Sequence, residues 1–207
     1  MSAQAFWDRH AQKYAKQPIA DQTAYEDKLR RVADFLHPTD RVLEIGCGTG
    51  GTARHLAQVV DHVTATDLSA EMIRIAKARS EADTASSPHF LQAGAGKHLG
   101  GPPFDAVCAF SLLHLVDDIP GVLDAAFQQI KPGGYFLSKT VCLKDGPRWM
   151  QIMVRVLMAV GIAPNVILIS RTELTRLLTT AGFDIVETRY FGKKRINPFI
   201  VARRPAV

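Results

Sequence analysis

Residues 41–51 of this chain read Arg41-Val42-Leu43-Glu44-Ile45-Gly46-Cys47-Gly48-Thr49-Gly50-Gly51. The apolar first half is typical of a buried strand, and a helical pattern over residues 52–57 follows the glycines directly. Because glycine lacks a Cβ, the backbone of this turn can adopt positive φ angles and approach a ligand closely. The helix N-terminus behind the turn offers unpaired N–H groups to polar or negative ligand atoms. The stretch therefore predicts a strand–turn–helix seat for a nucleotide-type cofactor.

The glycine spacing alone fits two kinds of cofactor site. Gly46-x-Gly48-x-x-Gly51 matches the dinucleotide fingerprint, and Asp67 lies about 20 residues onward, where a ribose-binding carboxylate is expected. The spacing Gly46-x-Gly48-x-Gly50 after a Val-Leu-Glu strand is equally typical of a second cofactor class. The choice between the two cofactor classes depends on motifs elsewhere in the sequence.

Length and composition indicate one ordinary globular domain. The chain has 207 residues, of which 47% are hydrophobic and 22% charged, so we expect a single domain spanning residues 1–207. The net charge of +5 is mild and is concentrated at residues 193–195 and 203–204. Such runs are usually solvated surface, and nucleic-acid binding requires a broader basic face with aromatic residues. We therefore expect no nucleic-acid partner.

The cysteines and the N-terminus favour a reduced, cytoplasmic protein. Cys47, Cys108 and Cys142 lie in or beside apolar strand patterns, and no Cys-x-x-Cys pair is present. An odd number of cysteines without this spacing argues against both a disulfide framework and a metal site. Residues 1–7 lack the basic region and apolar run of a secretory signal. We expect no stable membrane insertion, and a monomer or a homodimer.

Two helices are predicted before the glycine turn. Residues 4–16 carry Phe6, Trp7, His10 and Tyr14 at helical spacing, and this aromatic stripe indicates either core packing or a lid over a cofactor. A second helix is predicted from Tyr25 to Leu36, before Pro38. We interpret residues 1–37 as an N-terminal helical lid.

Strands and helices alternate after the glycine turn. Strands are predicted over residues 62–67, 89–93, 104–110, 135–141, 183–190 and 199–202. Ser69 caps one helix, Pro120 lies in the first turn of another, and residues 170–173 form a capping box for a third. The alternation indicates an α/β fold in which helices cover a parallel sheet.

Four motifs occur in order along this frame: Glu44-Ile45-Gly46-Cys47-Gly48-Thr49-Gly50, Asp67-Leu68-Ser69, Phe104-Asp105-Ala106-Val107 with His114 beyond it, and Ile130-Lys131-Pro132-Gly133-Gly134-Tyr135. Together they resemble the class I S-adenosylmethionine-dependent methyltransferases of the small single-domain type, from about residue 5 to residue 204. The Lys-Pro-Gly-Gly turn is a feature that a nicotinamide dehydrogenase does not supply. The resemblance implies a Rossmann-like doubly wound sheet of order 3-2-1-4-5-7-6, with the seventh strand antiparallel and helices on both faces.

The resemblance also implies a site for S-adenosyl-L-methionine. Asp67 would bind the ribose hydroxyls, Leu68 would pack on the adenine, and Gly46, Gly48 and Gly50 would admit the methionine part. The carbonyls of Gly46 and Phe110 would meet the ammonium group, and Glu44 would orient the loop or a water. Backbone groups of Gly94 and Ala95 would read the adenine edge, since Gly94 stands where many relatives have aspartate. The remaining expected cofactor-binding residues are Tyr14, Cys47, Met72 and Ser111.

His114 is the candidate catalytic residue. Methyl transfer needs a base only when the acceptor loses a proton, and the ordinary histidine pKa of about 6.5 suits that role. A lone histidine at this position can equally line the acceptor pocket. Ser111 and Lys139 are weaker candidates, and the sequence offers no metal-ligand cluster.

Residues 147–169 form the most unusual stretch after the glycine turn. Apolar residues occupy nearly every helical position before Gly161 and Pro164, and a helix apolar on all sides is expected to be buried. We predict an apolar cap in which Trp149, Met153 and Leu157 line the acceptor pocket, together with His114. A dimer interface or plain core packing is the alternative.

The sequence therefore predicts methyl transfer from S-adenosylmethionine to a small apolar or aromatic acceptor. Three alternatives remain open. They are a lipid-like or membrane-surface acceptor, a non-catalytic protein that binds S-adenosylmethionine, and a dehydrogenase.

Overall fold

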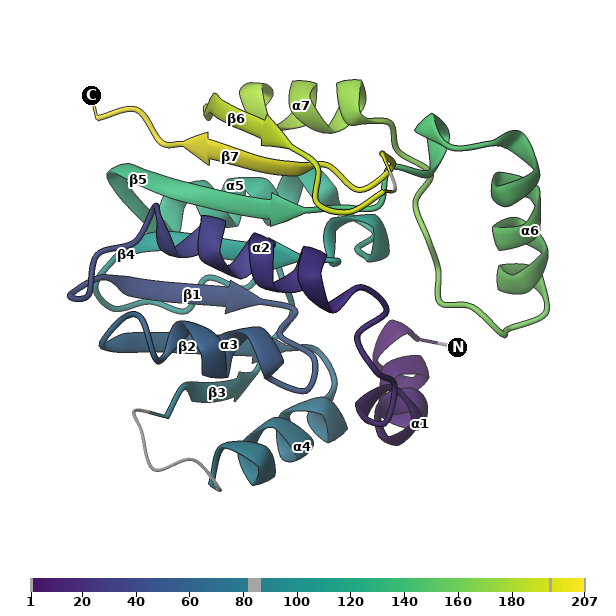
Figure 1. Cartoon of the computed structure of the whole chain (residues 1–207), viewed down its shortest axis with the longest axis horizontal. Helices are drawn as coiled ribbons and strands as arrows, with labels where there is room; N and C mark the ends of the chain where they lie inside the picture. Colours follow the sequence, from purple (N-terminus) through teal and green to yellow (C-terminus); the bar gives the residue numbers. More distant parts are fainter. Residues whose placement is uncertain (1, 82–86, 194, 207) are drawn as a thin grey trace.

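Seven strands form one sheet in the order β3-β2-β1-β4-β5-β7-β6 (Figure 1). The computed structural model describes residues 2–81, 87–193 and 195–206, so Lys194 of the basic run lies outside the described residues. The strands are β1 (Arg41–Ile45), β2 (His62–Asp67), β3 (His89–Gln92), β4 (Phe104–Phe110), β5 (Ile130–Lys139), β6 (Asp184–Arg189) and β7 (Phe199–Arg203). Strand β7 pairs antiparallel with β5 and β6, whereas β1 to β5 pair in parallel. The predicted fold and strand order are confirmed.

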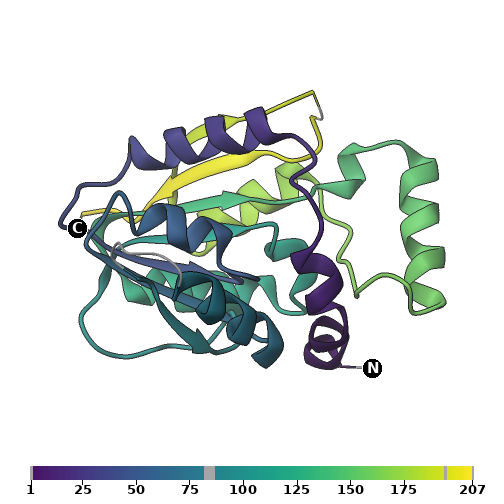
Figure 2. The same ribbon diagram turned by 60° about the horizontal axis from the view of Figure 1, so that its bottom comes forward.

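The sheet has two apolar faces because neighbouring strand residues point to opposite sides. On one face, α2 (Gln22–Ala33), α3 (Gly51–Leu56) and α4 (Ala70–Ser80) cover a core that includes Val42, Cys108 and Leu137. On the other, α5 (Ile119–Gln129) and α7 (Arg171–Thr180) cover the alternate positions Leu43, Val107 and Phe136. Figure 2 shows the resulting three layers from a second direction.

The helices begin where the sequence offers a cap. Ser69 Oγ accepts a hydrogen bond from the N–H of Met72, and Asp118 caps α5 through the N–H of Gly121. Ser170 and Glu173 form the predicted capping box at the start of α7. Each cap satisfies an N–H group that a helix N-terminus leaves unpaired. These caps also hold the loops at the carboxyl edge of the sheet in place.

The N-terminal region differs from the predicted lid of residues 1–37. Helix α1 (Ala3–Ala15) lies at the carboxyl edge of the sheet, beside α4 (Figure 1). Helix α2 instead covers a face of the sheet, with Leu29 and Val32 buried and Arg31 paired with Glu187 on β6. Of the two helices, only α1 therefore lies at the edge of the sheet where the lid is predicted. The second helix is part of the fold because its apolar side completes one core layer.

Strand β5 begins five residues earlier than predicted. It pairs with β4 from Ile130 onward, with a register shift, and carries Gly133 at φ +83° inside it. A proline followed by two glycines indicates a break in the strand. Here, however, Arg203 Nε donates to the carbonyl of Gly133, and the N–H of Arg204 donates to the carbonyl of Gly134. Pairing with β7 thus keeps this segment extended.

Helix α6 (Arg148–Ala159) was expected to be buried, and it is not. None of its residues is buried, and Trp149, Ile152 and Val156 are 55–63% exposed. Figures 1 and 2 both show it standing apart from the sheet, beyond the carboxyl ends of the strands. The apolar pattern did predict a helix, but pattern alone does not show whether a helix finds a partner within its own chain. Across the described residues, no helix is long and apolar enough to cross a bilayer.

Candidate functional site

The glycine turn has the backbone geometry that its sequence predicts. Gly46, Gly48 and Gly50 all have positive φ angles, of +69°, +55° and +78°. A Cβ on Gly46 would lie 2.6 Å from Leu112 Cδ1, whereas one on Gly48 would meet only Tyr14, at 3.6 Å. We call the turn of residues 46–51 the cradle. Its backbone is thus closely packed behind Gly46 and Gly50 and has free space at Gly48. Cys47 is buried beneath it, with its N–H bonded to the carbonyl of Thr66.

Glu44 lies at the end of β1, directly under the turn. Its carboxyl is buried, accepts the N–H of Ala53 in the first turn of α3, and leaves Oε2 without a hydrogen-bond partner. Burial raises the pKa of Glu44, and the ammonium of Lys28 opposes that rise. The carboxyl therefore organises the N-terminus of α3 and keeps one buried acceptor available.

Lys28 is a site residue that the sequence analysis missed. It comes from α2, is 3% exposed, and places Nζ 4.1 Å from the centre of the Phe110 ring. The hydrogen bond from its Nζ to Thr52 Oγ1 is long, at 3.5 Å. Burial lowers the pKa of Lys28, while the carboxyl of Glu44 favours its charged form. A buried cation is thus held at the end of β4, close to the glycine turn.

Asp67, at the end of β2, connects two loops of the site. Its Oδ2 accepts the N–H of Gly48 at 2.9 Å, and its Oδ1 accepts the N–H of Ser69 at 2.9 Å. Burial raises the pKa of Asp67, and these two N–H groups counteract the rise. Each oxygen keeps a second lone pair for a ligand hydroxyl.

Helix α1 is fastened over this edge of the site. Asp8 Oδ1 accepts from Ser69 Oγ at 2.6 Å, and Arg79 donates to both Thr49 Oγ1 and the carbonyl of Ala15. Tyr14 lies against Gly48, and burial together with Asp67 raises its pKa. The structure buries Met72 beneath α1, with Ala11 and Ile75, instead of bringing it to the pocket.

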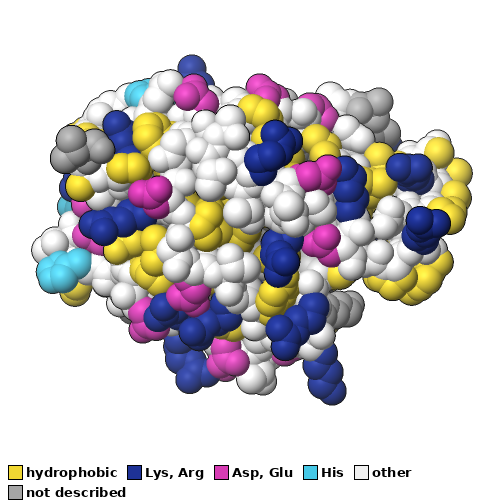
Figure 3. Space-filling model, turned by 90° about the horizontal axis from the view of Figure 1, so that it is seen from above, with side chains coloured by type: hydrophobic (Ala, Val, Ile, Leu, Met, Phe, Trp, Pro, Cys, Tyr) yellow, Lys and Arg dark blue, Asp and Glu magenta, His cyan; other side chains and the backbone are white. Residues whose placement is uncertain are grey.

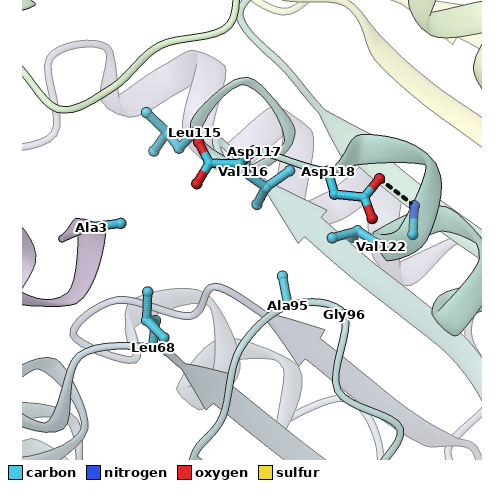
Figure 4. Close-up of a pocket in the computed structure, with 10 residues that line it drawn as sticks. Ala3, Leu68, Ala95, Gly96, Leu115, Val116, Asp117, Asp118 and Val122 are labelled. Carbon is cyan, nitrogen blue, oxygen red and sulfur yellow. Dashed lines mark hydrogen bonds between the residues drawn. The ribbon is translucent and has the colours of Figure 1, made fainter.

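A pocket of about 320 Å³ opens between the loops after β2, β3 and β4 (Figure 4). Leu68 and Ala95 face it from one side, and Val116 and Val122 from the other. Gly94 stands at the position of the expected aspartate, and a Cβ there would have open space around it. Ala3 of α1 also lines the pocket. The structure thus brings together the residues predicted on the adenine side.

The end of β4 supplies the opposite wall. Ser111 has φ +56°, a rare conformation for a residue with a side chain, and its N–H donates to the carbonyl of Lys139. His114 follows in η1 (Leu113–Leu115), is 8% exposed, and has Nδ1 buried without a hydrogen-bond partner. Leu115, next to it, lines the pocket. Phe110 and Ser111 therefore border the glycine turn, whereas His114 lies behind the wall.

The predicted cap residues are not brought to this pocket. Trp149 and Met153 are 62% and 45% exposed on α6, and neither they nor Leu157 are among the residues that line the pocket. The prediction that they line it is wrong for this conformation of the chain. A helix that points its widest apolar side away from the sheet cannot enclose a ligand at the strand ends.

Replacing Gly50 with alanine is expected to destabilise the fold by about 2–4 kcal/mol. The new Cβ would lie 2.9 Å from Phe90 and 3.0 Å from Ala76, at a φ of +78° that non-glycine residues rarely adopt. Gly48→Ala is the matched control, because its Cβ has room and should cost only about 1 kcal/mol. Urea unfolding measures both. Equal losses in the two variants would contradict this geometry.

His114 is expected to make the fold acid-sensitive. Burial lowers its pKa from 6.5 to about 4, so the unfolded chain binds this proton over a pH range in which the native state does not. The free energy of unfolding should therefore fall as pH drops from about 6.5, by about 3 kcal/mol at pH 4. Urea unfolding of His114→Gln should show a smaller loss over this range, whereas the exposed control His62→Gln should behave like the wild type.

The cradle fits S-adenosylmethionine. The open side of Gly48 admits the chain of an amino-acid group, while Glu44 Oε2 and Lys28 Nζ offer one acceptor and one donor at that end. Asp67 offers carboxylate oxygens that suit ribose hydroxyls, and the apolar wall of Leu68 and Ala95 suits a planar base. The site therefore has charged residues at one end and apolar residues at the other. The cofactor has its charged amino-acid group and its adenine in the same order.

Comparisons with known proteins point to the same cofactor. A family described as "Methyltransferase domain" matches residues 12–188. The chain is 34% identical over 102 residues to a ubiquinone biosynthesis O-methyltransferase of Xylella fastidiosa, covering 49% of this chain and 42% of the relative. It is 32% identical over 108 residues to phosphoethanolamine N-methyltransferase 1 of Arabidopsis thaliana, covering 52% and 22%. The chain thus spans less than half the length of these curated relatives.

Among solved structures, the magnesium protoporphyrin IX methyltransferase of Synechocystis PCC 6803 with bound S-adenosylhomocysteine has a TM-score of 0.74. It is 15% identical, and 97% of each chain is covered, so this likeness shows the fold. The family match covers most of the chain, and the strand order is the one that the resemblance implied. The chain belongs to the methyltransferase-domain family, and its fold is the one that class I S-adenosylmethionine-dependent methyltransferases share.

Proposed function

We propose that this protein transfers a methyl group from S-adenosylmethionine to a small apolar or aromatic acceptor. The observation that carries this proposal is the far wall of the pocket, where the apolar side chains of Leu115, Val116 and Val122 face the adenine side formed by Leu68 and Ala95. An apolar pocket favours an apolar acceptor because burying its surface is the main source of binding energy. The bacterial relative named for ubiquinone biosynthesis supports an acceptor that carries a ring.

The residues divide between the two ends of the cofactor. Asp67 holds the ribose hydroxyls, Leu68 and Ala95 contact the adenine, and the backbone of Gly94 and Ala95 replaces the missing aspartate. The carbonyls of Gly46 and Phe110 and the cation of Lys28 hold the amino-acid end. Tyr14 lies against Gly48 and closes the cradle from the side of α1.

The cofactor supplies a methyl group on a positively charged sulfur, which is reactive without further activation by the protein. The work of this chain is to hold the acceptor within roughly 3–3.5 Å of that group and to exclude water. Helix α1, fastened through Asp8 and Arg79, is the element that excludes water. Leu115 and Val116 orient the acceptor.

In this proposal His114 supports the pocket wall from behind and does not take a proton. A histidine whose pKa lies at about 4 is a weak base near neutral pH, where a general base works best with a pKa close to the ambient pH. We therefore place His114 behind the wall of the acceptor pocket, next to Leu115, which lines it.

Lys28→Met is expected to weaken binding of S-adenosylhomocysteine by about tenfold to a hundredfold, because a charge-assisted bond is lost. Methionine keeps the apolar stem that packs on Phe110. Binding of 5′-methylthioadenosine, which lacks the amino-acid end, is the control and should be unchanged. Equal weakening of both ligands in calorimetry would show that Lys28 only supports the loop.

The acceptor class is tested by turnover with methyl-labelled cofactor and a panel of acceptors. The panel pairs a catechol and an alkyl-substituted phenol with a primary amine and a phosphorylated ethanolamine of similar size. We expect label in the aromatic members, and more with the alkyl-substituted phenol. Label confined to the charged amines would contradict an apolar pocket, and binding without any turnover would favour a non-catalytic protein.

A further inference from the structure

The outer face of α6 is the largest apolar feature that the candidate site does not use. We define it as Trp149, Ile152, Met153, Val156 and Val160, which share one side of the helix and are 45–63% exposed. Ile162, directly after the helix, is 64% exposed. Figure 3 shows hydrophobic side chains gathered at this end of the molecule, with Lys and Arg beside them. Contiguous apolar surface of this kind usually marks an interaction site.

The charged residues within the segment 146–170 have one sign. Residues 146–170 contain two charged side chains, Arg148 and Arg155, and no aspartate or glutamate. These arginines lie seven residues apart, two helical turns, and therefore on the same side of α6. Both are exposed, and neither forms an ion pair with another residue that the structure describes. A helix with an apolar face, an aromatic residue and a cationic border has the composition of a helix that lies in a membrane interface.

We propose that α6 binds the surface of an anionic lipid bilayer, with its outer face among the acyl chains and its arginines at the phosphates. The charge pattern favours this occupant over a second copy of the chain. Two α6 helices packed together would place arginines near each other without an acidic residue in this segment to pair with them. Lipid phosphates supply that missing negative partner.

The segment that returns from α6 connects this surface to the pocket. Asn165 Nδ2 donates to Asp117 Oδ1 at 2.9 Å, and Asp117 lines the pocket. Two residues on, the N–H of Ile167 donates to the carbonyl of His114 at 2.8 Å. Figure 1 shows α6 beyond the carboxyl ends of the strands, and the loops after those ends line the pocket, so a bilayer on α6 would lie at the edge of the sheet that carries the pocket. Resting on the proposed function, this geometry points to an acceptor dissolved in the membrane.

The test is sedimentation of the full chain with vesicles of phosphatidylcholine, with and without phosphatidylglycerol. We expect strong binding to the anionic vesicles, weaker binding to the neutral ones, and release as salt screens the arginines. Arg148→Gln and Arg155→Gln should each lower the partition coefficient about fivefold on anionic vesicles only. Equal binding to both kinds of vesicle, or no binding, would overturn the proposal.

Val156→Asp tests the apolar face itself. It should lower binding at least about tenfold, since it removes an apolar anchor and adds a negative charge. Val186→Asp is the matched control: Val186 is 51% exposed on β6, Val156 is 55% exposed, and the charge change is the same. The control should bind like the wild type. Equal losses in both variants would show a charge effect unrelated to α6.

A second copy remains the competing occupant, and light scattering decides between the two. A monomeric wild type with α6-dependent vesicle binding supports the proposal. A dimer that Val156→Asp dissociates, without vesicle binding, overturns it. Affinity for S-adenosylhomocysteine should stay unchanged in Val156→Asp, because α6 does not line the pocket. Failure of the membrane proposal is thereby distinguishable from failure of the proposed function.

Discussion

Replacing Asp67 with alanine should weaken binding of S-adenosylhomocysteine by about tenfold to several hundredfold, the largest effect expected of any single side chain here. Hydrogen bonds to a charged group contribute about 1.5–3 kcal/mol each, and the carboxylate of Asp67 is placed for the ribose. It also holds the N–H of Gly48, so its loss loosens the cradle. Calorimetric titration measures the affinity directly.

The fold should survive this change, because Asp67 ends a strand and belongs to neither core cluster of the sheet. Asp105→Ala is the matched control. Asp105 is a carboxylate of β4 near the opposite edge of the sheet, where it accepts the N–H of Arg41 and pairs with Lys131. The control should bind S-adenosylhomocysteine normally. Unchanged affinity in Asp67→Ala would exclude the ribose assignment.

Deleting residues 1–18 should abolish turnover, yet leave a domain that unfolds cooperatively. Helix α1 contributes no residue to the two core clusters of the sheet, so removing it exposes chiefly Met72 and Ile75 of α4. The reaction would lose the element that excludes water from the cradle. Turnover and thermal unfolding of the truncated chain measure the two effects separately.

Asp8→Asn is the control that keeps α1 and weakens its attachment. Asp8 accepts bonds from Ser69 Oγ and the N–H of Glu71, and a neutral amide holds these donors less tightly. We expect intermediate turnover and an unfolding temperature close to that of the wild type. If the truncated chain fails to fold, α1 is core. If it turns over normally, α1 is not a lid.

The features that could be predicted from sequence depend on local rules. Alternation of apolar residues, caps such as Ser69 and Ser170, and the glycines at positive φ each act over a few neighbours, so the pattern determines them. The strand order followed from the family resemblance, which four short motifs carried. These parts of the fold needed no knowledge of distant contacts.

The parts that sequence reasoning missed depend on tertiary partners. Lys28 lies in a helix with Arg30 and Arg31, a setting typical of solvated charge, and only the packing of α2 on the sheet buries it. Met72 looked available to a ligand, but α1 covers it. Likewise, the apolar residues of α6 predicted burial, and the chain provides no surface to bury its outer face.

The most direct test of the cofactor assignment is calorimetric titration of the wild-type chain with S-adenosylhomocysteine and, separately, with NAD. Both ligands carry an adenosine, so the protein can distinguish them only by the groups attached beyond the ribose. The site described here predicts saturable one-to-one binding of S-adenosylhomocysteine, weakened by Asp67→Ala, and no saturable heat with NAD. Saturable binding of NAD with none of S-adenosylhomocysteine would contradict the account.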